Sequence, residues 1–173
     1  MPTVPAHDDH RPCGGGLAPG EAHDTVDIVC NLVVPTLANG RKTLKLSLAA
    51  PKHPDAVVTL PDGSQQLAVP PGAVRLFRII LASEWGWRFD VSPDVEGAPI
   101  RFKDGTHAGH YHLSGAGDMA LGLIGRSTVA GGFVGPAVRH AFNLYLVFAQ
   151  PGGAADLRLR IDPDCGNPPP PPG

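Results

Sequence analysis

The stretch that decides the fold is Val26-Asp27-Ile28-Val29-Cys30-Asn31-Leu32-Val33-Val34, because every second residue of it is apolar. Residues 26, 28, 30, 32 and 34 share one parity, which in an extended chain places all of them on one side. A period of two with one wholly apolar side is typical of a strand that rests one face on a core. The segment therefore predicts a β-strand with one dry face.

The same period recurs outward from this stretch, in Leu44-Leu46-Leu48, in Trp85-Trp87-Phe89-Val91 and in Leu157-Leu159-Ile161, each alternating with other residues. Segments 74–82 and 141–149 are apolar on both parities, which is typical of central strands covered on both faces. The tryptophans are interpreted as bulky core anchors, with a position of one ring at an interface as the alternative. The expected core includes Leu44, Leu46, Leu48, Trp85, Trp87, Phe89, Phe142, Leu144, Leu146, Leu157 and Leu159.

Turn signals separate these runs, because glycine supplies a positive φ and proline a preset φ for chain reversal. They are Asn39-Gly40, Pro61-Asp62-Gly63-Ser64, Pro70-Pro71-Gly72, Asp104-Gly105 and Pro151-Gly152-Gly153. No helical period is long enough to build a crossover. The sequence predicts an all-β protein, an antiparallel two-sheet sandwich of the immunoglobulin-like or jelly-roll type with about eight or nine short strands.

The 173 residues suit one domain, which we place at residues 25–162. Residues 1–24 contain almost no large apolar side chain and read as a flexible N-terminal arm, because burial cannot offset their ordering entropy. Residues 163–173 end in Pro168 through Pro172, which favour an extended polyproline II tail.

Composition narrows the function classes. The formal charge is −2, with 14 basic and 16 acidic residues, so no cationic footprint for nucleic acid is expected. The sequence has neither a membrane-length apolar run nor a signal-peptide pattern at its start, which predicts a soluble, cytoplasmic protein without a membrane partner. Three unequally spaced cysteines, Cys13, Cys30 and Cys165, predict reduced thiols rather than a disulfide framework or a zinc knuckle.

One cluster of ligand-type side chains stands out, Thr106-His107-Ala108-Gly109-His110-Tyr111-His112. In an extended chain His110 and His112 project from the same face, and His107 can reach in from the turn. His140 supplies a further candidate nitrogen. Imidazoles suit a divalent transition metal such as zinc or iron, whereas the simpler interpretation is a polar loop of exposed or hydrogen-bonded histidines that needs no cofactor. His140 equally fits a residue that caps the core.

Two family resemblances follow from these residues. The order Gly105, His110, His112, Asp118, Gly125 is similar to that of the cupins, β-barrel metalloproteins with an H-x-H pair, which implies a metal site. The ending Arg160-Ile161-Asp162-Pro163-Asp164-Cys165-Gly166-Asn167, after the strand around Phe142 to Leu146, resembles the DP-EP family of small bacterial β-sandwich proteins. That resemblance covers about the last third of the chain and implies a fold rather than an activity.

No nucleophile elbow, phosphate loop or dinucleotide fingerprint occurs in a suitable context. The first hypothesis is therefore a non-catalytic structural or interaction module that acts by self-association or assembly, with a second copy or another protein as its partner. The alternative is a metal-binding protein or metal-dependent enzyme that uses His107, His110 and His112, with His140.

Overall fold

The computed structural model describes residues 11–34, 36, 38–42, 45–92, 99–102, 110–127, 138–140 and 142–161, with residues 138–140 as backbone alone. Within these residues the chain is all-β, with three short 3-10 turns at Pro54–Ala56, Ser83–Trp85 and Pro151–Gly153. The strands are β1 (Asp24–Val33), β2 (Lys45–Ala49), β3 (Val57–Thr59), β4 (Gln65–Val69), β5 (Val74–Leu81), β6 (Trp87–Phe89), β7 (Ile100–Phe102), β8 (Tyr111–Ala116), β9 (Ala120–Arg126), β10 (Val138–His140), β11 (Phe142–Phe148) and β12 (Leu157–Ile161).

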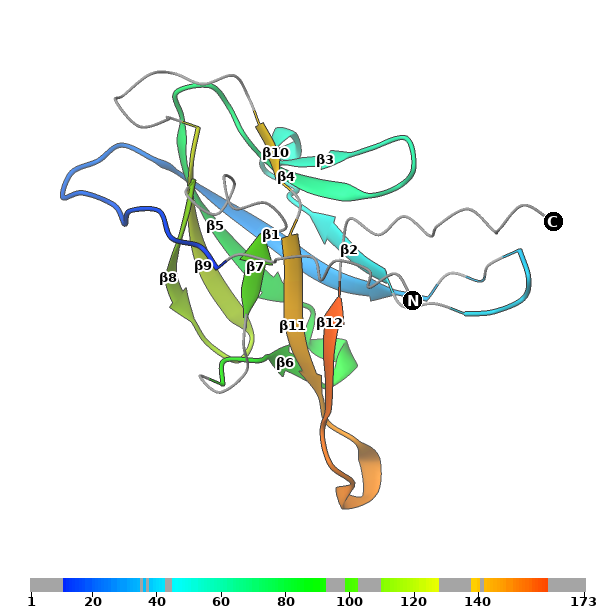
Figure 1. Ribbon diagram of the computed structural model, residues 1–173. Coiled ribbons are helices and arrows are strands. Elements are labelled where there is room, and N and C mark those ends of the chain that lie inside the picture. The colour runs from blue at the N-terminus through cyan, green and yellow to red at the C-terminus, as the bar shows by residue number, and fades with distance from the viewer. Residues whose placement is uncertain are drawn as a thin grey trace, which may run out of the picture.

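The described strands form three sheets, where two were predicted (Figure 1). One sheet has five strands in the order β2-β1-β5-β9-β8, and another has three in the order β10-β4-β3. The third sheet has four strands: β11 is central, with β12 on one side and β6 and β7 on the other. The twelve described strands exceed the eight or nine expected, because several are only three residues long.

One pairing departs from the antiparallel prediction. β1 and β5 run parallel, with Val26 opposite Phe77 and Ile28 opposite Ile79. A parallel pair needs a long connection, and the chain between β1 and β5 supplies one that includes β2, β3 and β4. Every other strand pair of the described residues is antiparallel.

The core lies on one side of the five-stranded sheet, where alternate residues of β1, β2, β5 and β9 meet side chains of β4, β6, β7 and β11. The alternation in β1 is confirmed, since Val26, Ile28, Cys30 and Leu32 are all buried. Phe102 of β7 stacks on Tyr111 of β8 with ring centroids 4.2 Å apart, which joins two sheets through the core.

Two predicted core residues are exposed instead. Trp85 is 41 % exposed, because residues 83–85 form a 3-10 turn and Gly86 adopts the left-handed region at φ 60°, which breaks the alternation before Trp87. Leu157 is 43 % exposed, since it lies at the far end of the projecting β11–β12 hairpin (Figure 1). Leu159 is only partly buried, and Leu44 lies outside the described residues.

The two segments predicted to be covered on both faces behave differently. β11 is buried on both faces for most of its length and is central in its sheet, as predicted. β5 is also central, but only one of its faces is buried, and Leu76, Arg78 and Ile80 lie on the other. The described residues include no helix of the length and apolarity needed to cross a bilayer.

Candidate functional site

The described members of the histidine cluster are held by backbone carbonyls. His112 lies in β8, where it faces away from buried Tyr111, and its Nδ1 is 2.9 Å from the Gly14 carbonyl oxygen. His110 lies just before β8, with Nδ1 2.8 Å from the Arg126 carbonyl oxygen. A carbonyl oxygen only accepts, so each Nδ1 carries the proton that it donates. In the neutral His112 ring, Nε2 then holds the lone pair.

The rest of the predicted metal set is not brought together by the described residues. His107 lies outside the described residues. His140 is the last residue of β10, which belongs to another sheet, and only its backbone is described. Asp118 lies at the β8–β9 turn, whereas His112 pairs with Ile124 toward the other end of that hairpin. Among the described residues, no three His, Cys, Asp or Glu side chains form a group that could hold a metal ion.

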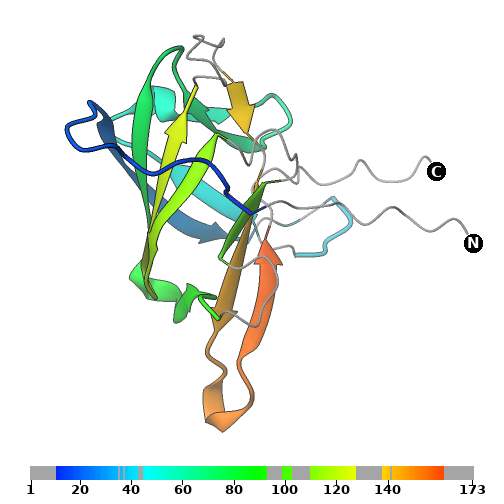
Figure 2. The same cartoon turned by 60° about the vertical axis from the view of Figure 1, so that its left-hand side comes forward.

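The N-terminal segment, residues 14–21, lies against the same end of β8 and β9 (Figure 2). The Gly14 amide donates to the Tyr111 carbonyl at 2.6 Å. The Arg126 guanidinium donates to the carbonyl oxygens of Gly15 and Gly16 and pairs with Glu21 at 2.6 Å. Residues expected to be part of a flexible arm thus make specific contacts with the sheet.

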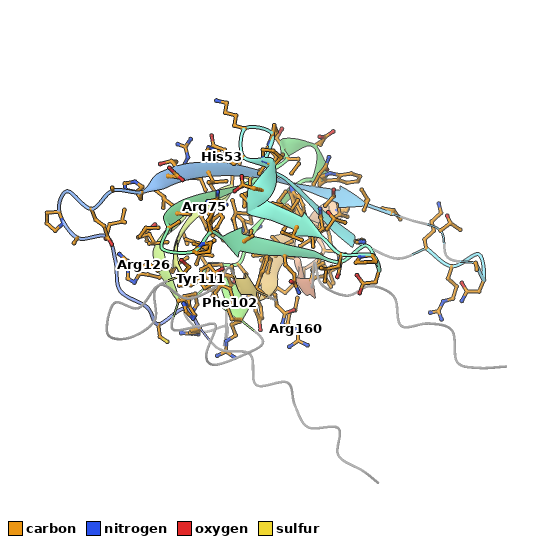
Figure 3. The ribbon with its side chains drawn as sticks, turned by 90° about the horizontal axis from the view of Figure 1, so that it is seen from above. His53, Arg75, Phe102, Tyr111, Arg126 and Arg160 are labelled. Atoms are coloured by element: carbon orange, nitrogen blue, oxygen red, sulfur yellow. The ribbon has the colours of Figure 1, made fainter. Side chains whose placement is uncertain are left out.

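Arg126 organises this contact electrostatically. In Figure 3 it lies beside the N-terminal segment, at the end of the sheet where Tyr111 and Phe102 meet. Its hydrogen bond to Glu21 lowers the pKa of that carboxyl below its ordinary value of 4.5, with the Ala18 amide as a second donor. The carboxylate form of Glu21 therefore favours the attached segment.

The side of the five-stranded sheet opposite the core is called here the outer face. It carries large apolar side chains in contact with solvent: Val29 and Val33 of β1 are each 40 % exposed. The register places Val29 opposite Ile80 of β5 and Ile80 opposite Ala120 of β9, which makes a continuous apolar row across three strands. Exposed apolar area of this kind marks interaction surfaces more often than solvent-facing sheet.

Trp85 belongs to the same surface. Its indole Nε1 donates to the side-chain oxygen of Asn31 at 2.6 Å, and Asn31 lies on the outer face between Val29 and Val33. The ring is therefore fixed beside the valines although it is 41 % exposed. An exposed tryptophan whose only polar group is satisfied presents a rigid apolar surface.

A hollow of about 400 Å³ lies on the outer face next to this row. Its lining is mostly apolar and small, with Arg78 and Ser114 as the polar side chains: Leu76, Arg78, Ile80, Ser114, Gly115, Ala116, Gly117, Ala120, Leu121 and Gly122. The β8–β9 register shifts between Leu113 and Gly115, a bulge that shapes the rim. Sites of this size bind through shape and apolar area, with few polar groups setting orientation.

Of the two described cysteines, one is buried and one is exposed. The Cys30 thiol packs in the core, where burial raises its pKa to about 12 and keeps it protonated. Cys13 is exposed, and Cys165 lies outside the described residues. Ser114, a neighbour of His112 in sequence, lies on the wall of the hollow.

Sequence reasoning missed the outer face, although a signal was present. In residues 26–34 the parity assigned to solvent contains Val29 and Val33 beside Asp27 and Asn31. Valine is favoured in strands, but two valines on the side assigned to solvent also signal an exposed apolar surface. Comparison with protein-family models, with curated proteins and with solved structures finds no match for this chain, so both family resemblances stay predictions.

Proposed function

We propose that the protein is a non-catalytic association module that binds a second copy of itself through the outer face of the five-stranded sheet. The observation that carries this proposal is the apolar patch of Val29, Val33 and Trp85, three of the exposed large hydrophobic residues on one surface. A patch on one flat face suits an isologous dimer, in which the same surface of each copy meets its counterpart. Of the two partners predicted from the sequence, a second copy and another protein, we propose the second copy.

The scaffold of the proposal is the β-sandwich predicted from the sequence, with two layers around one core. Stacking of Phe102 on Tyr111 supports contact between the β11 sheet and the five-stranded sheet. Gly125 of β9 lies close to Val69 of β4, which supports the same arrangement for the three-stranded sheet. On this basis the outer face is the free side of one layer.

The test compares two variants with the same chemical change. Val29→Asp places a charge in the apolar patch, and Leu157→Asp places one at a residue of similar exposure, 43 %, in the β11–β12 hairpin. Full burial of a valine is worth roughly 1.5–3 kcal/mol. Val29 is 40 % exposed, so dimerisation buries only part of that at each of its two occurrences, but Val29→Asp also adds the cost of burying a charge, and together these should weaken dimerisation about tenfold. Sedimentation equilibrium of the full chain measures the dissociation constant, and circular dichroism checks that both variants keep their strands.

The proposal predicts a concentration-dependent dimer for the unchanged chain and for Leu157→Asp, with dissociation for Val29→Asp. A monomer at all accessible concentrations would overturn it, and so would equal effects of the two variants.

A second candidate function is binding of a divalent transition metal by His110 and His112. The observation in its favour is that both Nδ1 atoms donate to backbone carbonyls, the outer-shell arrangement that fixes the tautomer of metal-ligating histidines. Two imidazoles do not complete a zinc site, so His107 or His140 would have to contribute. Native mass spectrometry tests it. A near-stoichiometric bound metal that is lost in the double variant His110→Ala, His112→Ala supports this function. An unchanged chain that carries no bound metal, or a double variant that keeps the metal, refutes it.

A further inference from the structure

Resting on the proposed self-association, we propose that Trp85 of each copy occupies the outer-face hollow of the other. Trp85 and the hollow lie on the same side of the five-stranded sheet, since the ring binds Asn31 of β1 and the hollow is lined by β5, β8 and β9. In an isologous dimer both copies contribute the same surface, so each ring can meet the hollow of the other copy and the contact occurs twice. The occupant of the hollow is thus a second copy of this chain.

The hollow suits an aromatic ring because its floor lacks side-chain bulk. A Cβ on Gly115 would meet nothing within 4 Å, which means that the space above this glycine is open. Gly122 also forms part of the lining, but there the Ser114 side chain covers the backbone, since a Cβ on Gly122 would lie only 2.4 Å from the Ser114 hydroxyl oxygen. Leu76 and Ile80 supply apolar walls. A planar ring can therefore pack over the open backbone at Gly115, against the aliphatic side chains of Leu76 and Ile80 and beside Arg78.

Trp85 is prepared for such a contact in the single copy. The hydrogen bond to Asn31 satisfies the indole N–H and holds the ring, so little rotamer freedom remains to be lost on binding. Aromatic side chains bury roughly 150–250 Å² each and are enriched among the residues that dominate interfaces. Trp87, by contrast, is already buried against Phe148 and donates to the Ala82 carbonyl.

Charge complementarity points the same way. Glu84 is exposed and directly precedes Trp85, while Arg78 lines the hollow with 54 % of its side chain exposed. Asp27 accepts two of the five N–H donors of the Arg78 guanidinium, through Nε and Nη2. A ring that enters the hollow brings Glu84 toward this cation, and the twofold arrangement makes the contact twice.

The experiment uses one variant for each half of the contact. Trp85→Ala removes the ring and keeps the hollow, whereas Ala120→Phe fills the hollow and keeps the ring. Leu157→Phe adds the same phenyl group at an exposed strand position of another sheet and serves as the control. We expect each of the first two to raise the dissociation constant at least about tenfold in sedimentation equilibrium, and the control to leave it unchanged.

Mixing the two variants gives the decisive measurement. In the mixed dimer, Trp85 of the Ala120→Phe chain can enter the intact hollow of the Trp85→Ala chain, so one of the two contacts is restored. An equimolar mixture should therefore associate more tightly than either variant alone. Variants that do not fold would fail to complement each other and would lose cooperative urea unfolding.

The outcomes separate this inference from the proposed function. A wild-type monomer would overturn both. A dimer that Val29→Asp disrupts, but that Trp85→Ala and Ala120→Phe leave intact, keeps the outer face as the interface and overturns the ring-in-hollow contact. A mixture that associates no better than its components would overturn it as well.

Discussion

Removing Asp55 should destabilise the fold more than removing its ion-pair partner, Arg75. The Arg75 side chain is only 4 % exposed, whereas that of Asp55 is 58 % exposed. Arg75 donates to Asp55 through Nη2 and to the Ala68 carbonyl through Nη1 at 2.9 Å, which ties β5 to β4 and to the turn before β3. Loss of Asp55 leaves a buried cation, and loss of Arg75 leaves a carboxylate that water can reach.

The magnitudes follow from this asymmetry. Breaking a buried pair by deleting one partner costs about 3–5 kcal/mol, and because water partly screens Asp55 we expect about 2–3 kcal/mol for Asp55→Ala. Arg75→Met removes the charge, keeps most of the volume and forfeits one net hydrogen bond, worth about 1 kcal/mol. In the double variant the loss of Asp55 should cost almost nothing beyond Arg75→Met, a coupling that a double-mutant cycle isolates.

Urea unfolding followed by tryptophan fluorescence measures all four chains, and Asp156→Ala is the matched control. Asp156 pairs with Arg88 at 2.8 Å, with both side chains at least 40 % exposed, so its loss should barely move the unfolding midpoint. The reasoning is refuted if Arg75→Met is the more destabilising single change, or if the two single losses add in the double variant.

Three further results are expected. Gly125→Ala should lower the free energy of unfolding by about 1–3 kcal/mol in urea titration, since its Cβ would lie 2.9 Å from a Tyr111 ring carbon, while Gly115→Ala, with open space, should not. Native alkylation followed by peptide mass spectrometry should label Cys13 and spare Cys30 until the chain is unfolded. Because the pKa of Glu21 is lowered, its stabilisation is present above 4.5 and is lost as pH falls through the lowered value. The protection factors of residues 14–21 against hydrogen exchange, which correct for the pH dependence of the intrinsic rate, should therefore fall there, and Glu21→Gln should lower them at neutral pH only.

Strand positions were predictable wherever the buried residues of a strand all fall on alternate positions of the sequence. Residues 26–32 meet that condition, since one face of β1 is buried, whereas residues 142–147 of the central strand β11 are buried on both parities and were predicted from their continuous apolar run. Trp85 does not meet the condition, since Gly86 in the left-handed region turns the chain between two tryptophans that sequence places in one strand. Leu157 alternates correctly, but its end of the hairpin has no facing layer.

The contacts of the N-terminal segment were beyond prediction for a different reason. Arg126 binds the carbonyl oxygens of Gly15 and Gly16, more than a hundred residues away, and His112 binds that of Gly14. Every residue has a backbone carbonyl, so the amino-acid sequence does not indicate which carbonyl oxygen accepts a hydrogen bond from a distant side chain. The described contacts of this segment are hydrogen bonds and an ion pair, which a lack of large apolar side chains does not predict.

The edges of the five-stranded sheet favour face-to-face association over edge pairing. At β2 the Gln65 side chain imitates a neighbouring strand: its oxygen accepts from the Leu48 amide at 2.7 Å, and its nitrogen donates to the Leu48 carbonyl at 3.0 Å. At β8 the Gly14 amide donates a hydrogen bond to the Tyr111 carbonyl oxygen, and the bulge around Ser114 interrupts the regular register. Bonded or bulged edges are poor templates for another strand. Under the proposed self-association a second copy would meet the outer face, where exposed valines and an indole need no change in backbone pairing.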